Sequence, residues 1–477
     1  MKMPAHKTKI VCTIGPASDS PERLAQMMLA GMNIARINFS HGDFSGHGQV
    51  MRRIREAARA VGRRVAIMAD LPGPKIRLGQ IADEPIFLRS GEPFVLTTQE
   101  LEGNDKRASV SLPTLPQVVK KGDIIFINDG LIQLRVEAMQ GGEIISRVEV
   151  GGELRSRKGL NLPGIDLGES AFTKDDYRCL KFALENGVDC ISQSFVSQAA
   201  DIDHVRQAAA GLGYQPFIVA KIERKSGREN IDAILAAADG IMVARGDLGV
   251  EIPIEEIAVT QKNIIAKANL LGKPVITATQ MLESMVKNRR PTRAEATDVA
   301  NAVLDGSDCV MLSGESAVGQ YPLEAVAMLA KIAAATEPYR SPGHYYRMLD
   351  YLKARENKKL VDLITLSVEK ISGEINPGAV LVPSTSGATA RSLSRFRLPV
   401  WIFAVSSREQ SCQELLFSYG IFPLFYSGHP VDWRSYVAAL VDEYEVRADF
   451  VIVTEGPSPA HPQAHHRMEI IDLCRHV

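Results

Sequence analysis

Short apolar runs containing β-branched residues alternate with amphipathic segments along the first two thirds of the chain. The runs predict buried strands, and the segments between them, with apolar residues three and four apart, predict helices. The predicted strands are Ile10–Gly15, Ile34–Ser40, Val65–Leu71, Cys190–Val196, Phe217–Glu223, Ile241–Asp247, Val275–Gln280 and Cys309–Glu315, and the predicted helices include Pro21–Ala30, Ile202–Ala210, Ile231–Ala238, Ile254–Leu271, Arg293–Leu304 and Leu323–Thr336. Eight such strand–helix units predict an α/β fold whose main domain is a closed (β/α)₈ (TIM) barrel.

A long segment separates the third and fourth predicted strands and exceeds the usual length of a βα loop. It contains short alternating stretches at Pro85–Phe94, Ala108–Leu112, Asp123–Ile127, Gln133–Glu137 and Glu143–Val150, separated by Gly-rich turns. This pattern predicts a small inserted β-barrel domain. Because it is inserted in a barrel loop, we expect it to form a lid over the barrel mouth.

A turn-rich break at residues 339–343 marks a second predicted boundary. Beyond it, a helix near Lys358–Ile371 and apolar runs at Ala379–Val382, Val400–Val405, Phe422–Tyr426 and Phe450–Val453 predict a further α/β domain. The predicted division is therefore 1–71 and 168–338 for the two parts of the barrel domain, 72–167 for the lid domain and 339–477 for a C-terminal α/β regulatory domain.

Composition restricts the function further. The chain has 477 residues, 45% of them hydrophobic, and a formal net charge of -1, so no global field favours nucleic acid or an anionic membrane. The start of the chain lacks an apolar stretch long enough for a signal peptide or a membrane span, and we expect a cytoplasmic protein. The six cysteines are far apart without metal-site spacing, which predicts reduced and mostly buried thiols.

Polar residues follow or end several of the predicted barrel strands, where barrels of this class place their active sites. They are Arg36, Asn38, Ser40, Asp70, Lys221, Glu223, Arg245, Asp247, Thr279, Ser313 and Glu315. Pairs two residues apart on one strand are expected to project from the same face. Any one of these residues can instead meet solvent or cap the next helix, but together they predict a ring of charged groups.

Two carboxylates in this set, Glu223 and Asp247, form the hard oxygen site that Mg²⁺ prefers. Lys221 beside them can neutralise a phosphoryl group or an enolate, or can simply pair with Glu223. Backbone N–H groups in the Gly246–Gly249 turn can bind a carboxylate or phosphate, or form a plain βα turn. No GxxxxGK[ST] motif and no strand-linked GxGxxG motif is present, so a nucleotide must be held without the usual phosphate loop.

Seven segments resemble signature sequences of the pyruvate kinase family in the same order. They are Thr8-Lys9-Ile10 through Ile14-Gly15-Pro16, Arg36-Ile37-Asn38-Phe39-Ser40-His41-Gly42, Gly73-Pro74-Lys75-Ile76-Arg77, Ala220-Lys221-Ile222-Glu223, Ala244-Arg245-Gly246-Asp247-Leu248-Gly249, Thr277-Ala278-Thr279-Gln280-Met281-Leu282 and Met311-Leu312-Ser313-Gly314-Glu315. The resemblance implies a Mg²⁺-dependent glycolytic enzyme that transfers the phosphoryl group of phosphoenolpyruvate to ADP, giving pyruvate and ATP. It also implies a homotetramer.

The resemblance implies roles for the residues around the metal site. Glu223 and Asp247 would bind Mg²⁺, or Mn²⁺ in its place, and Lys221 would stabilise the transferring phosphoryl group and the developing enolate. Backbone N–H groups near Gly246 and Asp247, together with Thr279, would hold the substrate carboxylate. The other residues implied in catalysis are Arg36 and two members of the network that protonates the enol, Ser313 and Glu315.

The resemblance also implies a nucleotide side of the site. Arg36 and Arg77 would hold the phosphoryl groups of both substrates, with Asn38 and His41 near the nucleotide. Lys158 resembles the lid lysine that reaches the nucleotide when the lid closes.

One departure from the commoner family pattern concerns K⁺. Many members need K⁺ and carry Glu where this chain has Lys75, and Thr where it has Leu71. A lysine ammonium is a fixed monovalent cation and can take the electrostatic role of K⁺ beside Asp70, Asn38 and Ser40. We therefore expect activity without K⁺. The alternative is that Lys75 is a solvated surface charge and K⁺ is still bound.

In the C-terminal region, the segment Ser384-Thr385-Ser386-Gly387-Ala388-Thr389 follows an apolar run and precedes a helical stretch. It resembles the sugar-phosphate effector loop of the family, and the alternative is a hydroxyl-rich N-cap. The later loop from Gly456 to Pro462 lacks the Gly-rich pattern of members that bind fructose 1,6-bisphosphate, which favours a sugar monophosphate or a nucleotide such as AMP as activator.

Two other readings remain open at this level. Another phosphoenolpyruvate- or pyruvate-handling barrel, such as a Mg²⁺-dependent lyase or aldolase, would lack the lid and the Gly-Pro-Lys-Ile-Arg segment. A non-catalytic metabolite sensor on the same fold would be expected to have lost Lys221, Glu223, Asp247 or Thr279, and all four are present.

Overall fold

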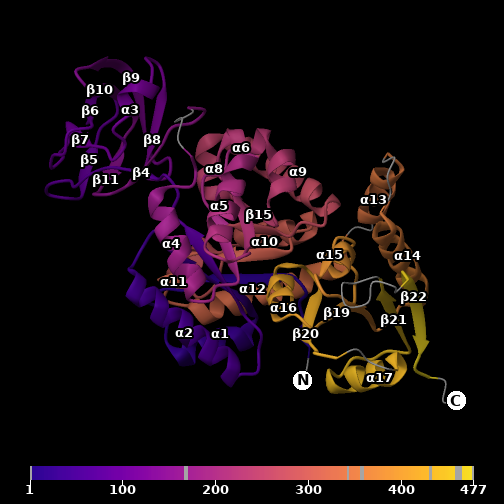
Figure 1. Cartoon of the computed structure of the whole chain (residues 1–477). Helices are drawn as coiled ribbons and strands as arrows, with labels where there is room; N and C mark the ends of the chain where they lie inside the picture. Colours follow the sequence, from indigo (N-terminus) through magenta and orange to yellow (C-terminus); the bar gives the residue numbers. More distant parts are fainter. Residues whose placement is uncertain are drawn as a thin grey trace.

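Eight parallel strands close into a barrel at the centre of the molecule (Figure 1). The computed structural model describes residues 3–165, 170–340, 343–354, 359–428, 432–456 and 465–474, with the backbone alone for 343–345. The barrel strands are β1 (Lys9–Thr13), β2 (Met32–Asn38), β3 (Ala66–Leu71), β13 (Cys190–Gln193), β14 (Phe217–Ile222), β15 (Gly240–Ala244), β16 (Val275–Ala278) and β17 (Cys309–Leu312). They lie in the order β1-β17-β16-β15-β14-β13-β3-β2, which confirms the predicted (β/α)₈ barrel.

Helices cover the outside of the barrel and bury their apolar faces against it. They are α1 (Pro21–Ala30), α2 (Phe44–Ala60), α4 (Lys174–Glu185), α5 (Ala199–Gly211), α6 (Lys225–Glu229), α7 (Ile231–Ala237), α8 (Arg245–Glu251), α9 (Ile257–Leu270), α10 (Arg293–Asp305), α11 (Gly314–Ala317) and α12 (Pro322–Thr336), with 3₁₀ turns η1 (Ile254–Glu256), η2 (Glu283–Val286) and η3 (Glu337–Tyr339). Their starts follow local chemistry: Ser20 caps α1 before Pro21, and Thr173 and Thr292 begin α4 and α10 with capping boxes.

Seven of the eight barrel strands end one to three residues earlier than predicted, and in two of them the difference changes the site. The predicted strands reached Asp247 and Glu315, whereas β15 ends at Ala244 and β17 at Leu312, and the chain turns directly into α8 and α11. The expectation that Arg245 and Asp247 share a strand face was therefore wrong. Alternation of apolar and polar residues does not mark the point at which the backbone turns helical.

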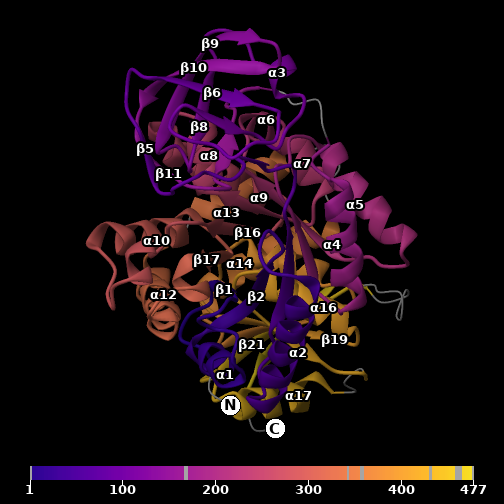
Figure 2. The same ribbon diagram turned by 90° about the vertical axis from the view of Figure 1, so that its left-hand side faces the viewer.

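The segment between β3 and α4 folds into a separate β domain, which lies above the barrel in Figure 2. Its elements are β4 (Ile76–Arg77), β5 (Ile86–Leu88), β6 (Pro93–Thr97), β7 (Arg107–Ser109), α3 (Leu115–Val118), β8 (Ile124–Ile127), β9 (Ile132–Gln140), β10 (Glu143–Val150), β11 (Gly152–Leu154) and β12 (Gly159–Asn161). It has its own apolar core. The predicted strand Pro85–Phe94 is divided into β5 and β6 by a turn at Gly91. The predicted domain boundary at 167/168 lies outside the described residues.

The C-terminal domain contains a five-stranded sheet in the order β20-β19-β18-β21-β22, in which only β22 is antiparallel to its neighbour. Its elements are α13 (Gly343–Lys353), α14 (Leu360–Ile375), β18 (Ala379–Pro383), α15 (Ala388–Ser394), β19 (Trp401–Ser406), α16 (Glu409–Glu414), η4 (Leu415–Phe417), β20 (Ile421–Phe425), α17 (Trp433–Glu443), β21 (Phe450–Glu455) and β22 (Arg467–Asp472). Lys358, the predicted start of the first helix, and residues 341 and 342 of the predicted boundary lie outside the described residues.

Buried polar contacts join the amino ends of the barrel strands to this domain. Asp308, just before β17, pairs with Arg397 at 2.6 Å and accepts a hydrogen bond from the Tyr419 N–H at 2.9 Å. Lys9 in β1 donates to the carbonyl oxygen of Ile421 at 2.6 Å. The two domains therefore pack with specific, water-excluded bonds and not with apolar surface alone.

All six cysteines are free thiols, and only Cys474 is exposed, as the sequence predicted. No helix within the described ranges combines the length and apolar character that a membrane span requires.

Candidate active site

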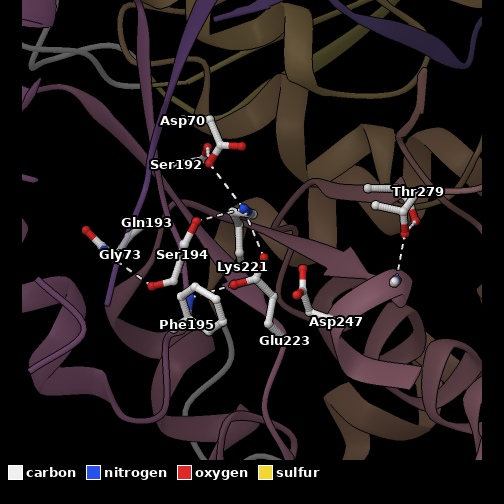
Figure 3. A network of polar contacts seen from close by, with 12 residues as sticks. Asp70, Gly73, Ser192, Gln193, Ser194, Phe195, Lys221, Glu223, Asp247 and Thr279 are labelled. Carbon is white, nitrogen blue, oxygen red and sulfur yellow. Dashed lines mark hydrogen bonds and ion pairs between the residues drawn. The ribbon is translucent and has the colours of Figure 1, made fainter. Parts of the chain in front are cut away.

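Lys221 lies in a buried polar cluster at the carboxyl ends of the barrel strands (Figure 3). Its ammonium donates to the Ser194 Oγ at 2.7 Å and pairs with Glu223 Oε1 at 2.9 Å and Asp70 Oδ1 at 3.3 Å. Burial alone would lower the pKa of Lys221, but the charges of Asp70 and Glu223 outweigh it and raise that pKa above its ordinary value. The structure therefore holds this side chain in place and favours its charged form.

Arg36 on β2 is held in place by two neighbours. Its Nε donates to Asp70 Oδ2 at 2.7 Å and its Nη1 to Thr13 Oγ1 at 2.8 Å. Asp70 also accepts a hydrogen bond from the Ser192 hydroxyl at 2.9 Å. Burial opposes the Asp70 carboxylate, but Arg36 and Lys221 outweigh it and lower the pKa of Asp70. One ionised carboxylate thus fixes two cations whose charges face the barrel mouth.

Glu223, just after β14, and Asp247, in the first turn of α8, lie beside each other in Figure 3. Glu223 Oε2 accepts the Phe195 N–H at 2.7 Å. Burial, against the attraction of Lys221 and with added repulsion from Asp247, raises the pKa of Glu223. A further cation between the two carboxylates would relieve this repulsion.

The carboxylate oxygens of Glu223 and Asp247 suit Mg²⁺. No group of three or more His, Cys, Asp or Glu side chains within the described part of the chain could enclose a metal ion. Mg²⁺ does not need such a group, because it is commonly held by one or two carboxylates while waters and substrate oxygens complete its coordination. Glu223 and Asp247 fit that pattern, whereas a closed structural metal site would require more ligands.

Thr279, just after β16, has a left-handed backbone with φ 67°, which is strained for a β-branched residue. Its Oγ1 accepts the Gly246 N–H at 2.8 Å. Arg245 stabilises this conformation, since its Nη2 donates to the Thr279 carbonyl at 2.8 Å while its Nη1 pairs with Asp298 at 2.7 Å. The sequence placed Arg245 in the ring of charges, but its guanidinium supports the Thr279 turn.

Glu315 is fully buried and does not join the Lys221 cluster. Its carboxylate accepts the Ser313 N–H at 2.7 Å and the Leu282 N–H at 3.0 Å. It therefore ties together the segments that follow β16 and β17. Ser313, held by this bond, precedes α11 at the carboxyl end of β17.

The residues assigned to the nucleotide side come from β2 and from the lid. Asn38 Oδ1 accepts the Ser40 N–H at 3.1 Å. Burial first, and then the charges of Arg77, Lys75 and Arg36, lower the pKa of His41.

Two of the lid contacts involve backbone atoms. Arg77 Nη1 donates to the Arg157 carbonyl at 3.2 Å, and the Lys158 carbonyl accepts the Leu78 N–H at 2.9 Å. Leu71 is buried, and its carbonyl accepts the Ser194 hydroxyl at 2.7 Å.

Lys75 lies in the connection from β3 to the lid. Its ammonium is 3.6 Å from Asp247 Oδ1, and its side chain passes so close to Gly159 of the lid that a Cβ there would meet Lys75 Cε at 2.8 Å. It does not pair with Asp70, Asn38 or Ser40, which the sequence had grouped with it. One lysine therefore links the lid strand β12 to Asp247.

Four residues of the cluster were missed by the sequence reasoning. Ser192, Ser194 and Phe195 belong to the fourth strand and the turn after it, and Thr13 ends β1. The polar run Ser192-Gln193-Ser194 at the end of an apolar strand could have marked these residues as part of the site. Nothing in the sequence marks Phe195, because its contribution is a backbone N–H in a left-handed residue with φ 57°.

The proposed effector segment forms a turn between β18 and α15. The Ser384 Oγ accepts the N–H of Gly387, which has a left-handed φ of 74°. The Thr385 carbonyl accepts the Ser411 hydroxyl at 2.7 Å, and the Ser386 carbonyl accepts Arg391 Nη2 at 2.7 Å. Thr389 lies in the first turn of α15. Residues 457–464, which include most of the predicted second effector loop, lie outside the described residues.

Family models match most of the chain. Residues 5–326 match the model described as the pyruvate kinase barrel domain, and residues 362–471 match the pyruvate kinase alpha/beta domain.

Curated relatives and a solved structure agree with these matches. The pyruvate kinase of Thermococcus litoralis is 47% identical over 424 residues, covering 89% of each chain, and that of Geobacillus stearothermophilus is 46% identical over 421 residues, covering 87% of this chain and 71% of the relative. A crystal structure of a pyruvate kinase from Cryptosporidium parvum superposes with a TM-score of 0.91 at 36% identity, covering 98% of this chain and 96% of that one.

Proposed function

This chain belongs to the pyruvate kinase family of phosphotransferases, and from that premise we propose that Lys221, Arg36, Glu223 and Asp247 carry out Mg²⁺-dependent transfer from phosphoenolpyruvate to ADP without a requirement for K⁺. The observation that carries the assignment is the Lys221 ammonium, fixed by Ser194, Glu223 and Asp70 at the carboxyl ends of the strands.

Phosphoryl transfer is catalysed mainly by positioning and by positive charge near the transferring oxygens. Lys221 supplies such a charge without reorganisation, because its three oxygen partners already hold it. Arg36, locked by Asp70 and Thr13, supplies a second fixed cation. We assign Arg77 to the phosphoryl groups as well, with Asn38, His41 and Lys158 on the nucleotide side.

Mg²⁺ held by Glu223 and Asp247 would neutralise charge on the substrate oxygens. Thr279 and the N–H groups of Gly246 and Asp247 are assigned to the substrate carboxylate. In the structure the Gly246 N–H is bonded to Thr279, so a bound carboxylate would share or replace that acceptor.

The enolate left by transfer needs a proton at carbon. We assign this step to hydroxyls at the ends of β16 and β17, Thr279 and Ser313. Glu315 acts in this scheme as a positioning residue, since both of its carboxylate oxygens accept backbone N–H groups.

Independence from K⁺ rests on the charge balance around Asp70. That carboxylate is already neutralised by Arg36 and Lys221, and Lys75 adds a fixed cation beside Asp247. We propose that Lys75 supplies the positive charge that K⁺ supplies in other members.

The test is pyruvate formation from phosphoenolpyruvate, ADP and Mg²⁺ in buffer free of K⁺ and NH₄⁺, with K⁺ then added. We expect equal rates in both buffers for the wild type, and K⁺ activation in Lys75→Glu. The matched control Lys106→Glu, an exposed lid lysine, should behave as the wild type. Activity of the wild type only with K⁺ would contradict the role of Lys75 but still support the proposed reaction. Activity in neither buffer would contradict the proposed reaction itself.

We further propose that a sugar monophosphate or AMP activates the enzyme at the segment formed by Ser384, Thr385, Ser386, Gly387 and Thr389. The left-handed turn at Gly387 before α15 supports this, because such turns form concave sites for anions. The Gly387 N–H is bonded to Ser384 Oγ, so a bound anion would share or replace that acceptor. We also predict that the protein is cytoplasmic and that it assembles as a homotetramer.

A further inference from the structure

Phe195 lies in the turn after β13 and supports Glu223 through its backbone (Figure 3). Its N–H donates to Glu223 Oε2 at 2.7 Å, and its φ of 57° lies in the left-handed region, which is strained for a bulky residue. A strained backbone persists only where the surrounding structure holds it. The contacts of the Phe195 side chain, which is buried, therefore help to keep this N–H in place.

The Phe195 ring lies where the two chain connections of the lid meet the barrel. In the outgoing connection, residues 72–75, a Cβ added to Gly73 would lie 2.8 Å from Phe195 Cδ2, so the ring contacts this glycine. In the returning connection after β12, Leu162 and Ile165 line a small cavity of about 20 Å³ together with Phe195. A movement of the lid that displaces either connection therefore acts on the ring.

The two connections differ in how well their polar groups are satisfied. The Gly73 N–H donates to Asp176 Oδ1 in the first turn of α4 at 2.9 Å. Asn161, at the end of β12, is buried, but its Oδ1 has no hydrogen-bond partner among the described residues. The outgoing connection is therefore tied to the barrel, whereas the returning one begins at a buried acceptor that is unpaired in this lid position.

Arg224, the residue directly after Glu223, offers a matching donor. Its guanidinium carbon is 5.2 Å from the centre of the Phe195 ring, a cation–π contact, and its side chain lines the same cavity as Asn161. Within the described part of the chain, the guanidinium makes no hydrogen bond or ion pair. An unpaired donor and an unpaired acceptor therefore lie on either side of the cavity that the ring lines.

We propose that Phe195 is a positioning residue that couples movement of the lid to the geometry of Glu223, and that Arg224 pairs with Asn161 as the lid closes. The ring contacts the lid connections while the N–H of the same residue holds the carboxylate, so a shift of one is passed to the other. This coupling is reciprocal: a divalent cation bound by Glu223 favours the lid position that strengthens its own binding. The inference rests on the proposed metal role of Glu223 and adds the residues that connect it to the lid.

The experiment measures the position of the lid without turnover. Energy transfer between dyes at two exposed positions, Lys106→Cys in the lid and Lys181→Cys on α4, reports the distance from lid to barrel in a Cys474→Ser background. Mn²⁺ is titrated alone, and the Mn²⁺ that stays free is counted by electron paramagnetic resonance. With Phe195 and Arg224 intact, we expect the transfer efficiency to change in step with Mn²⁺ occupancy.

Two variants test the coupling. Phe195→Gly removes the ring and keeps the N–H, so Mn²⁺ should still bind, but the change in transfer efficiency at saturation should fall to roughly half or less. Arg224→Met should reduce the change in the same direction. Because Arg224 is only partly buried, this variant tests the inference even if Phe195→Gly does not fold. The matched control Arg228→Met, one turn further along α6 and paired with Glu256 at 2.6 Å, should respond as the parent protein does.

The outcomes separate this inference from the proposed function. An unchanged lid response in both variants would overturn the inference, as would a parent protein that binds Mn²⁺ without movement of the lid. A parent protein that does not bind Mn²⁺ at all would contradict the proposed role of Glu223 and Asp247, and the inference with it.

Discussion

Lys221 is surrounded by oxygen atoms that would lose their cation together if the lysine were replaced. Substitution of a side chain of similar length without charge, Lys221→Met, is therefore expected to lower kcat roughly 10²–10³-fold, as the removal of a preorganised transition-state contact does. Binding of phosphoenolpyruvate should change much less, because Arg36, Glu223 and Asp247 remain. Steady-state kinetics together with equilibrium binding separates the two effects.

The control is Lys181→Met on the exposed face of α4, which should leave kcat unchanged. Normal turnover of Lys221→Met would remove the role assigned to this lysine. Loss of binding equal to the loss of kcat would instead mean that Lys221 acts in the ground state.

At the residue scale, the sequence predicted side chains better than backbone groups. Lys221, Glu223 and Asp247 could be grouped in advance, because polar side chains at the carboxyl ends of barrel strands meet at one end of the barrel. The N–H of Phe195 and the strained turn at Thr279 could not be predicted, because both depend on left-handed φ angles that residue type does not reveal. Arg245 was placed in the wrong role for the same reason, since its partner is a backbone carbonyl.

Gly73, in the hinge between β3 and the lid, has a left-handed φ of 67°, and a Cβ there would lie 2.8 Å from Phe195 Cδ2 and 3.1 Å from Ser194 Cβ. Gly73→Ala should therefore shift the two residues that bond to Glu223 and Lys221, and lower kcat roughly ten- to hundredfold. The measurement is kcat alongside the free energy of unfolding.

Gly91→Ala is the matched control, because Gly91 also has a left-handed φ of 86° but no atom within 4 Å of its Cβ position. It should lose about 1–2 kcal/mol of stability from the backbone alone and keep its kcat. Equal activity of the two variants would show that the hinge does not communicate with the cluster.

Among the elements, those with strong local signals were predicted closely and those fixed by tertiary contacts were not. The helix at Pro21–Ala30 was predicted with its observed bounds because Ser20 and Pro21 define its start. In contrast, α8 was read as the end of a strand. The antiparallel strand β22 was missed, since its register against β21 is a long-range property.

The junction between barrel and C-terminal domain buries an amine. Lys9 is fully enclosed, and burial lowers its pKa from 10.5 to about 8. Between these two pH values the unfolded chain binds a proton that the folded chain does not, so the contribution of Lys9 to stability rises with pH through this window. The full effect is roughly 3 kcal/mol.

This predicts that the unfolding free energy of the wild type, relative to Lys9→Met, increases between pH 7.5 and pH 10. Chemical denaturation of both proteins at a series of pH values measures it, and Lys331→Met on the barrel surface should show no such trend. A difference that stays constant with pH would mean that Lys9 keeps its ordinary pKa in the folded protein.

For the whole molecule, the barrel and the presence of an inserted β domain followed from the order of the apolar runs. The packing of the C-terminal domain against the barrel could not be predicted from that order, because the contacts of Asp308 and Lys9 join residues that are remote in sequence.

The insertion between β3 and β13 also has a consequence for synthesis on the ribosome. Neighbouring barrel strands β3 and β13 pair from Met68 with Cys190 onward, yet every strand of the lid is translated between them. Domains generally fold as units in the order of their synthesis. We therefore expect the lid, with its own apolar core, to be complete while β3 still lacks its partner β13 and β1 lacks its partner β17. The open edges of these first barrel strands are the part of the nascent chain that most needs protection from aggregation.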